Sequence, residues 1–126
     1  MTNEDLLNLI QNKIDEDKIT VNLIQNEDIE QYDIVVCGAF NPYFEVESIS
    51  TPIEIDIHTH EKGAEVSWIE AQDILDEFNQ VLRHELIHLE QYTEDRFDFE
   101  DIEANEKEAY AKEKQETPWY SNITLE

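Results

Sequence analysis

Two histidines lie four residues apart in a segment with the apolar spacing of a helix, and a glutamate directly follows the first. The segment is His84-Glu85-Leu86-Ile87-His88. Side chains four apart on an α-helix project from the same face, so these two imidazoles can bind one zinc ion. The glutamate then lies beside the metal, where it can take a proton from a water molecule. The pattern predicts part of a metal site with Glu85 as general base; the alternative is a polar helix face with ordinary hydrogen bonds.

A zinc site in an enzyme usually has three protein ligands, so one more ligand is expected from a neighbouring element. The helix expected over residues 101–115 offers several glutamates. Glu106 is our first choice because helical spacing places it on one face with Ile102 and Ala109, where an unpaired carboxylate would be costly. Glu108 is the second choice and Glu103 the third. For each of them the alternative is a solvated side chain on an acidic helix.

Two segments together resemble a known family. His84-Glu85-Leu86-Ile87-His88-Leu89-Glu90-Gln91-Tyr92, followed by Asn105-Glu106-Lys107-Glu108-Ala109-Tyr110-Ala111, is similar to the small zincin-type metallopeptidases of tailed bacteriophages. More distantly it resembles the gluzincins, whose third ligand is a glutamate that begins an E-x-x-A pattern on the next helix. The resemblance covers roughly residues 53 to 112.

This resemblance implies Zn²⁺ as the cofactor, with His84, His88 and Glu106 as its ligands and Glu85 as the general base. It also implies a peptide or protein substrate, and a phage or host protein as a possible partner. The family often has Asp or Asn where Tyr110 stands in this chain. The carboxylate that usually supports a ligand histidine must then come from elsewhere, and the candidates are Asp73, Asp76 and Asp101.

The elements that must position these residues follow from apolar spacing and capping signals. Ser67 and Glu70 form a capping box that predicts a helix start at Trp68. The chain is expected to form a helix over residues 3–14, strands over 19–23, 32–37, 43–49 and 53–58, and helices over 68–92 and 101–115. A helix, three or four strands and two helices in this order predict an α+β fold. We expect one zincin-like domain over residues 1–116 and a C-terminal tail over residues 117–126.

Two of the predicted strands carry further expectations. Residues 32–37 are a continuous apolar run, typical of a strand buried on both faces, and Cys37 is expected in the core. Residues 53–58 alternate isoleucines with polar residues, so one face is core and the other is wet. We expect this strand to be the sheet edge before the motif helix and to pair with the substrate by β-augmentation.

Several polar side chains near the motif have open roles. Tyr92, Tyr110, His58 and His60 are all candidates for the hydrogen-bond donor that stabilises an oxyanion. His58 and His60 share a strand face and could form a second metal site, although exposed or partner-facing histidines are the favoured interpretation. Residues 95–100 are interpreted as a connector, with a rim or lid of the site as the alternative.

The chain is strongly acidic, with 32 acidic and 8 basic residues and a formal net charge of -24. Such a surface repels nucleic-acid phosphates and anionic membranes, so we expect no direct binding to either. Our leading hypothesis is a zinc metallopeptidase. The alternatives are a catalytically weak or inactive structural or interaction protein with the zincin fold, and an acidic DNA mimic of the anti-restriction type.

The sequence also bears on where the protein acts. The amino-terminal residues are acidic and lack a basic signal-peptide region, and no apolar run approaches the roughly 20 residues that span a bilayer. We expect a cytoplasmic protein, in the host cell if it is phage-encoded, with the virion as the alternative.

Overall fold

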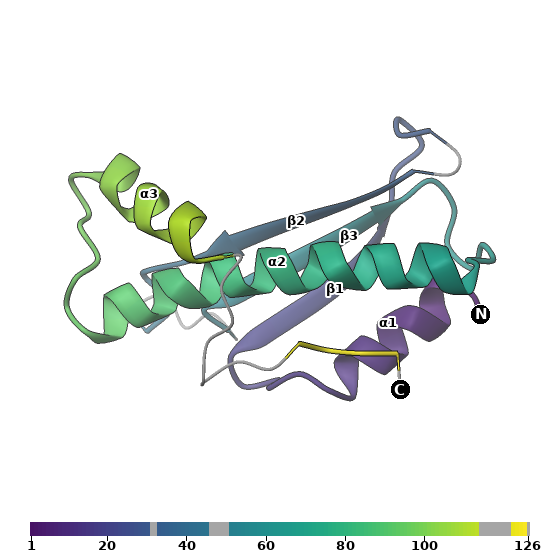
Figure 1. The fold of residues 1–126 in the computed structure, drawn as a ribbon, viewed down its shortest axis with the longest axis horizontal. Helices are drawn as coiled ribbons and strands as arrows, with labels where there is room; N and C mark the ends of the chain where they lie inside the picture. The colour runs from purple at the N-terminus through teal and green to yellow at the C-terminus, as the bar shows by residue number, and fades with distance from the viewer. Residues whose placement is uncertain (31–32, 46–50, 114–121, 126) are drawn as a thin grey trace.

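The computed structural model describes residues 1–30, 33–45, 51–113 and 122–125, which form an α+β fold, as predicted. Its described elements are three helices and a three-stranded mixed sheet (Figure 1). In chain order they are α1 (Asn3–Gln11), β1 (Ile19–Gln25), β2 (Ile34–Phe40), β3 (Ile53–Thr59), α2 (Trp68–Thr93) and α3 (Ile102–Lys112). Helix α2 crosses one face of the sheet, α1 lies beside β1, and α3 lies against the second half of α2.

The predicted helix starts are confirmed. Ser67 Oγ accepts a hydrogen bond from the Glu70 amide at 3.1 Å, and α2 begins at the next residue, Trp68. Helix α1 begins with a capping box between Thr2 and Asp5 but ends at Gln11, three residues before the expected end. The chain turns there because the Asp15 carbonyl accepts hydrogen bonds from the two amides that lead into β1.

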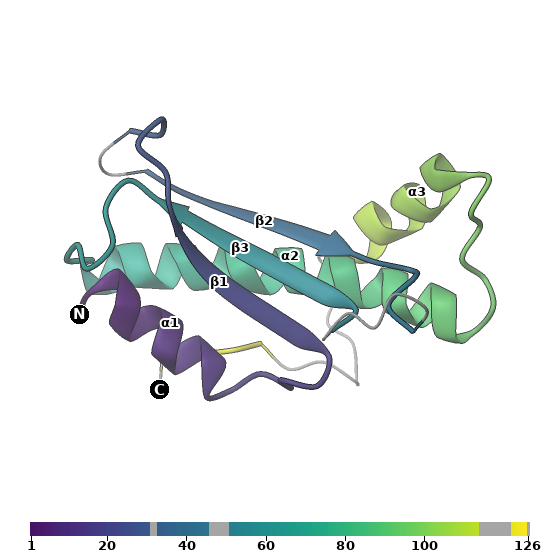
Figure 2. The same cartoon turned by 180° about the vertical axis from the view of Figure 1, so that it is seen from behind.

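The strand order is β1-β3-β2, with β1 parallel and β2 antiparallel to β3. The prediction that residues 53–58 form a sheet edge is therefore wrong, because β3 is the central strand and both of its sides are paired. Its Ile53, Ile55 and Ile57 are buried and its Glu54 is exposed, as the alternation predicted. A strand with one apolar face can be central here since no helix of the described residues covers the other face of the sheet (Figure 2).

The prediction that residues 32–37 form a strand buried on both faces is also wrong. In β2 only Val36 is buried, whereas Val35 is 40% exposed and Cys37 is exposed. The apolar run lies at the edge of the sheet, with its outward side chains uncovered by the described residues. The strand expected over 43–49 is absent from its described part, since residues 42–45 form a turn and 46–50 lie outside the described residues.

The core lies between the inner face of the sheet and the helices. Along α2 from its start to Leu82 the buried apolar side chains are Ala71, Ile74, Leu75, Phe78 and Leu82. In the second half the buried face turns toward β2 and α3, and it consists of Glu85, Ile87, His88 and Gln91 together with His84. The long helix therefore has an apolar half that stabilises the fold and a polar half that faces α3.

The last described residues return to this core. Ile123 and Leu125 are buried, and Asn79 of α2 accepts from the Ile123 amide at 2.9 Å and donates to its carbonyl at 3.0 Å. In Figure 1 this stretch, drawn in yellow, passes between α1 and α2. Among the described helices, none combines the length and the apolar character needed to cross a bilayer.

Candidate metal centre

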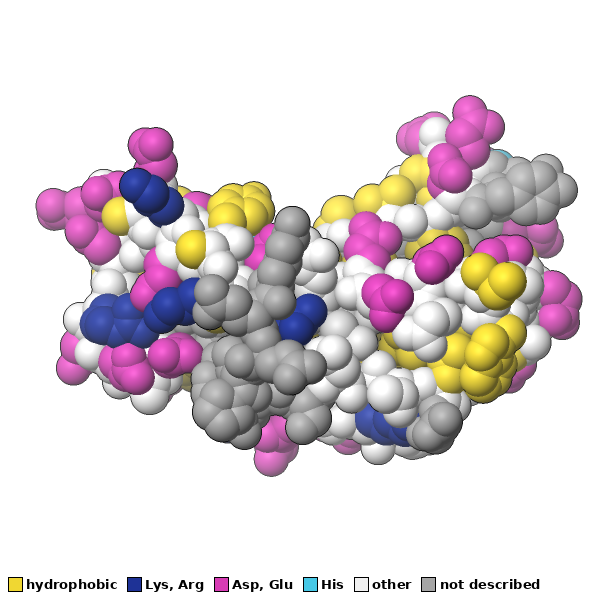
Figure 3. Space-filling view, in the orientation of Figure 1, with side chains coloured by type: hydrophobic (Ala, Val, Ile, Leu, Met, Phe, Trp, Pro, Cys, Tyr) yellow, Lys and Arg dark blue, Asp and Glu magenta, His cyan; other side chains and the backbone are white. Residues whose placement is uncertain are grey.

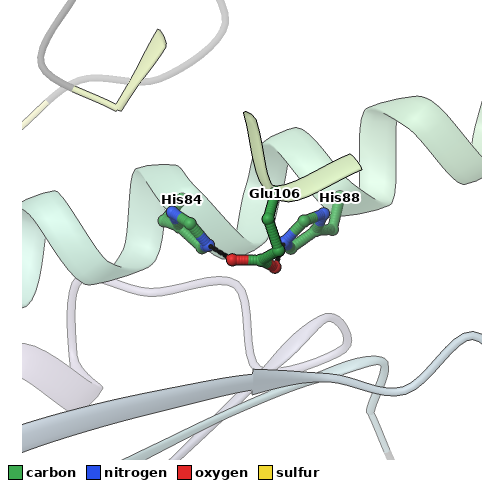
Figure 4. A group of neighbouring side chains, drawn as sticks. All are labelled: His84, His88 and Glu106. Atoms are coloured by element: carbon green, nitrogen blue, oxygen red, sulfur yellow. Dashed lines mark hydrogen bonds and ion pairs between the residues drawn. The ribbon is translucent and has the colours of Figure 1, made fainter. Parts of the chain in front are cut away.

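The three predicted ligands come together between α2 and α3. In Figure 4 both imidazoles project from α2 toward the Glu106 carboxylate of α3. The distance from His84 Nε2 to Glu106 Oε2 is 3.1 Å, and that from His88 Nε2 to Glu106 Oε1 is 2.6 Å. One potential ligand atom from each residue lies within 4.8 Å of the other two, and this is the one such group in the described part of the chain. A metal ion could be held there by two nitrogens and a carboxylate.

Helix α3 can approach α2 closely because Ala109 is fully buried at their contact, as its small size suggested. The predicted inner face of α3 is nevertheless wrong in part, because Ile102 is 54% and Tyr110 63% exposed. The buried positions are Asn105 and Ala109. The half of α2 that α3 meets is polar, so hydrogen bonds rather than apolar contacts orient α3.

The imidazole of His88 has a fixed tautomer because Gln91 occupies its Nδ1. Gln91 Nε2 donates to the Asn105 carbonyl at 3.1 Å and to Glu108 Oε1 at 2.8 Å. Both partners are acceptors only, so the amide cannot be turned around. Gln91 Oε1 then lies 3.0 Å from His88 Nδ1, and Nδ1 must carry the proton.

His84 is held in the same way by a carboxylate that the sequence analysis did not select. Glu113, at the end of α3 and 7% exposed, places Oε2 2.7 Å from His84 Nδ1 and accepts from Gln80 Nε2 at 2.8 Å with its other oxygen. Glu113 is therefore the carboxylate beside this candidate ligand histidine, whereas the sequence analysis named Asp73, Asp76 and Asp101 as candidates. The available signal was spacing: Glu113 follows Glu106 by seven residues, which is two helical turns, and shares its face.

These contacts determine what faces the Glu106 carboxylate. With Nδ1 the hydrogen-bond donor in both rings, each Nε2 faces a carboxylate oxygen and is the ring nitrogen left to bind a metal ion. Acceptors at 3.1 and 2.6 Å repel each other unless a proton or a cation lies between them. The hydrogen bonds around the site thus prepare both Nε2 atoms to bind a positive ion, and the donor set fits a metal.

Glu85, the predicted general base, is 7% exposed and borders the same site. A cavity of about 350 Å³ is lined by Gly38, Gln80, Val81, His84, Glu85, Glu106, Tyr110 and Glu113. Burial raises the pKa of the Glu85 carboxyl; the two histidines oppose this shift and the charge of Glu106 adds to it. A carboxyl with a raised pKa is the better proton acceptor, which suits a general base.

The other two candidates for the third ligand lie elsewhere. Glu108 accepts two hydrogen bonds from Arg96, at 2.7 and 2.8 Å, and one from Lys112. Its partial burial acts to raise its pKa, but the hydrogen bonds from Gln91, Arg96 and Lys112 outweigh this and lower the pKa of Glu108 to about 2. Glu108 is therefore a structural anion that ties α3 to the end of α2, and Glu103 is exposed.

Of the four candidate oxyanion donors, only Tyr110 borders the cavity, with its ring centroid 4.7 Å from that of His84. The Tyr92 hydroxyl donates to Glu45 at 3.3 Å. His58 alternates with the buried isoleucines of β3 and so lies on the outer face of the sheet, away from the metal centre. His60 Nδ1 lies 3.0 Å from the Ile29 carbonyl, and neither histidine belongs to a metal-binding group of described residues.

Comparison with known proteins finds no match: no family model, no curated protein and no solved structure is similar to this chain. What the site can do follows from its own residues.

Proposed function

We propose that this protein is a zinc-dependent metallopeptidase with a small zincin-like fold. The observation that carries the proposal is the pair of Nε2 atoms that face the Glu106 carboxylate while each ring is held through its Nδ1, with Glu85 in the cavity that His84 and Glu106 also line. Two histidines and a glutamate are one of the ligand sets of catalytic zinc in peptidases.

Each side chain has a defined task in this proposal. His84, His88 and Glu106 would hold the ion. The bound ion would lower the pKa of water and polarise the carbonyl group of the scissile bond. Glu85 removes a proton from the attacking water molecule and passes it to the leaving amine. Glu113 and Gln91 keep the two imidazoles in the required tautomer.

The substrate is proposed to lie along β2, which replaces the strand expected from the sequence. β2 is an edge strand with no charged residue in an otherwise acidic chain, and edge strands without charges favour pairing with another strand. Gly38 in this strand lies against Glu85, and Phe40 stacks on His88 with ring centroids 6.2 Å apart. A peptide added to this edge would pass directly beside the metal ligands.

Bound-metal analysis and peptide cleavage test the proposal together. We expect one zinc per purified chain, lost in His84→Ala, and hydrolysis of a peptide library that stops on addition of a chelator. Glu85→Gln should retain the zinc while turnover falls by at least about 100-fold, because the general base is lost. Exposed Glu77→Gln on the same helix is the matched control and should retain both zinc and activity.

Other outcomes separate the alternatives. If the purified protein contained iron instead of zinc, the assignment of the metal would change, since two histidines and a carboxylate also suit iron(II). Stoichiometric zinc without cleavage of any library peptide would favour the inactive, structural version of the fold. A protein that binds no metal at all would leave only the acidic surface to explain, and with it the DNA mimic.

A further inference from the structure

A cluster of aromatic side chains adjoins the metal centre on the side of His88. The Phe40 ring stacks on the imidazole with centroids 6.2 Å apart and an interplanar angle of 11°, and the Phe97 ring meets it edge-on at 6.1 Å. Phe40 also contacts the rings of Phe44, Tyr92 and Phe97, at 6.4, 6.1 and 5.6 Å. These rings come from the end of β2, the turn after it, the end of α2 and the connector to α3.

A cavity of about 440 Å³ is set into the outer side of this cluster. Its lining residues are Phe44, Glu45, Tyr92, Thr93, Asp95, Phe97 and Phe99. Four of the seven are aromatic, two are acidic and none is basic. The centroids of Phe44 and Tyr92 are 5.4 Å apart and those of Phe97 and Phe99 are 5.1 Å apart, so two pairs of aromatic rings contribute to the lining.

Two carboxylates, Glu45 and Asp95, lie beside the rings in the lining of this cavity. Glu45 accepts a hydrogen bond from the Tyr92 hydroxyl at 3.3 Å, and burial together with the Glu45 charge raises the pKa of Tyr92, so its hydroxyl stays protonated. Asp95 has a φ of 58°, in the left-handed region. It directly follows the C-cap of α2, where the Arg96 amide bonds the Gln91 carbonyl, and glycine is the usual residue at that point. An aspartate there accepts backbone strain and adds a negative charge to the cavity wall.

We propose that this cavity binds the side chain of a lysine or arginine in a peptide. Aromatic faces attract a cation, and carboxylates nearby add a direct charge interaction while they keep the cation hydrogen-bonded. An apolar side chain in the same place would remove water from Glu45 and Asp95 without forming a hydrogen bond or an ion pair with either carboxylate.

The position of the cavity connects it to the proposed peptidase. Phe44 follows the end of β2 by four residues, so a peptide paired with β2 and passing His88 would next meet this space. The substrate class that we infer is a peptide with a basic residue near the scissile bond. The cleavage part of this inference rests on the proposed function, whereas the binding part does not.

Binding is tested in the Glu85→Gln protein, with and without added zinc, using three short capped peptides that differ only in the central residue: lysine, arginine or norleucine. Norleucine has an unbranched carbon chain like that of lysine but no charge. We expect the two basic peptides to bind at least about fivefold more tightly than the norleucine peptide, which is the order of a cation–π contact. In NMR spectra of the protein, the amide chemical shifts that change when the basic peptides bind should be mainly those of residues 92–99.

The double variant Glu45→Gln with Asp95→Asn should lose this preference and bind all three peptides alike. Exposed Asp73→Asn with Glu77→Gln, in the first half of α2 and outside the lining of the cavity, makes the same change in net charge and should keep the preference. Equal binding of norleucine and lysine by the unaltered cavity, or an undiminished lysine preference in the first double variant, would overturn the inference.

A cleavage assay then separates the two proposals. If the wild-type protein binds lysine peptides in the cavity and never cleaves them, the peptidase proposal fails and the binding site remains. If the protein cleaves peptides with no preference for a basic residue, the peptidase remains and the cavity has another role.

Discussion

The two imidazoles of the metal centre illustrate how a neighbouring hydrogen bond determines the chemistry of a side chain. Neither ring is free to choose its tautomer, because Glu113 and Gln91 occupy the Nδ1 atoms. The two supports differ in kind: His84 is backed by a buried carboxylate and His88 by a neutral amide. The carboxylate of Glu113 makes the His84 imidazole more basic than the His88 imidazole. We therefore expect the hydrogen bond to Glu113 to raise the metal affinity more than the hydrogen bond to Gln91 does.

Glu113→Gln tests this asymmetry. The amide keeps the shape of the side chain but removes the negative charge beside His84 Nδ1, and we expect zinc affinity to fall by about 10-fold to 100-fold. Competition with a chromophoric chelator measures the dissociation constant. Glu103→Gln, an exposed change on the same helix, is the control and should leave the constant unchanged. Equal constants for Glu113→Gln and wild type would mean that Glu113 is only a structural partner of Gln80.

The sequence predicted the three residues that converge, but not their supports. His84, His88 and Glu106 carry strong signals, namely a four-residue spacing and an inward position on a helix. Glu113 is one glutamate among several in an acidic segment, and only its two-turn distance from Glu106 distinguishes it. Gln91 became meaningful only when the structure showed Asn105 and Glu108 within reach of its amide. Such contacts depend on how two helices pack, which local patterns do not encode.

Among the elements, β2 and α2 approach each other closely at Gly38. A methyl group at this position would lie 2.6 Å from Val81 Cγ1 and 2.9 Å from Glu85 Cγ, distances that side chains essentially never show. The glycine is thus needed for close approach of the backbone to the helix, and not for an unusual φ angle. The proposed substrate edge of the sheet and Glu85, the proposed general base, can lie this close because Gly38 has no Cβ atom.

We therefore expect Gly38→Ala to destabilise the protein by about 1–3 kcal/mol, as for overpacking in a tight core, and to displace Glu85. Chemical denaturation measures the first effect and peptide turnover the second. Val81→Ala in the same chain should recover part of the stability, since it removes the closest clash. Ala39→Gly, at the next position of β2, is the control for glycine content and should leave turnover unchanged. Full activity and stability in Gly38→Ala would contradict the proposed tight contact.

Helix starts were predictable and strand partners were not, for a physical reason. A cap such as Ser67 is a local interaction between residues three apart, so it can be recognised without knowledge of the fold. Strand order is set by residues far apart in the chain. The apolar run of β2 is compatible with a buried strand or with a sheet edge, and the structure places it at the edge, with Val35 and Cys37 exposed. This run has no charged residue, and its Gly38 borders the candidate metal centre.

The whole molecule has a net charge of -24, so cations can also bind to its acidic surface. Binding at the proposed metal site must therefore be distinguished from binding at this surface. On the face seen in Figure 3, acidic side chains (magenta) are scattered from end to end rather than set in a line, and hydrophobic side chains (yellow) follow the edge over β2. Scattered carboxylates attract divalent cations weakly and without preference. A centre with two imidazoles differs because nitrogen ligands favour zinc over calcium.

Metal-dependent stability distinguishes these two kinds of binding. A ligand that binds only the folded state at 100 times its dissociation constant adds about 2.7 kcal/mol, which for a chain of this size raises the melting temperature by roughly 10 °C. We expect zinc to produce such a shift and a chelator to reverse it.

Calcium at the same concentration serves as the control for general screening of the acidic surface, and it should produce a much smaller shift. His84→Ala should abolish the response to zinc and keep the response to calcium, because only zinc needs the imidazole that joins α2 to the Glu106 carboxylate of α3. If zinc stabilised His84→Ala as much as wild type, the ion would be bound by surface carboxylates. The contact between α2 and α3 would then not depend on a metal ion.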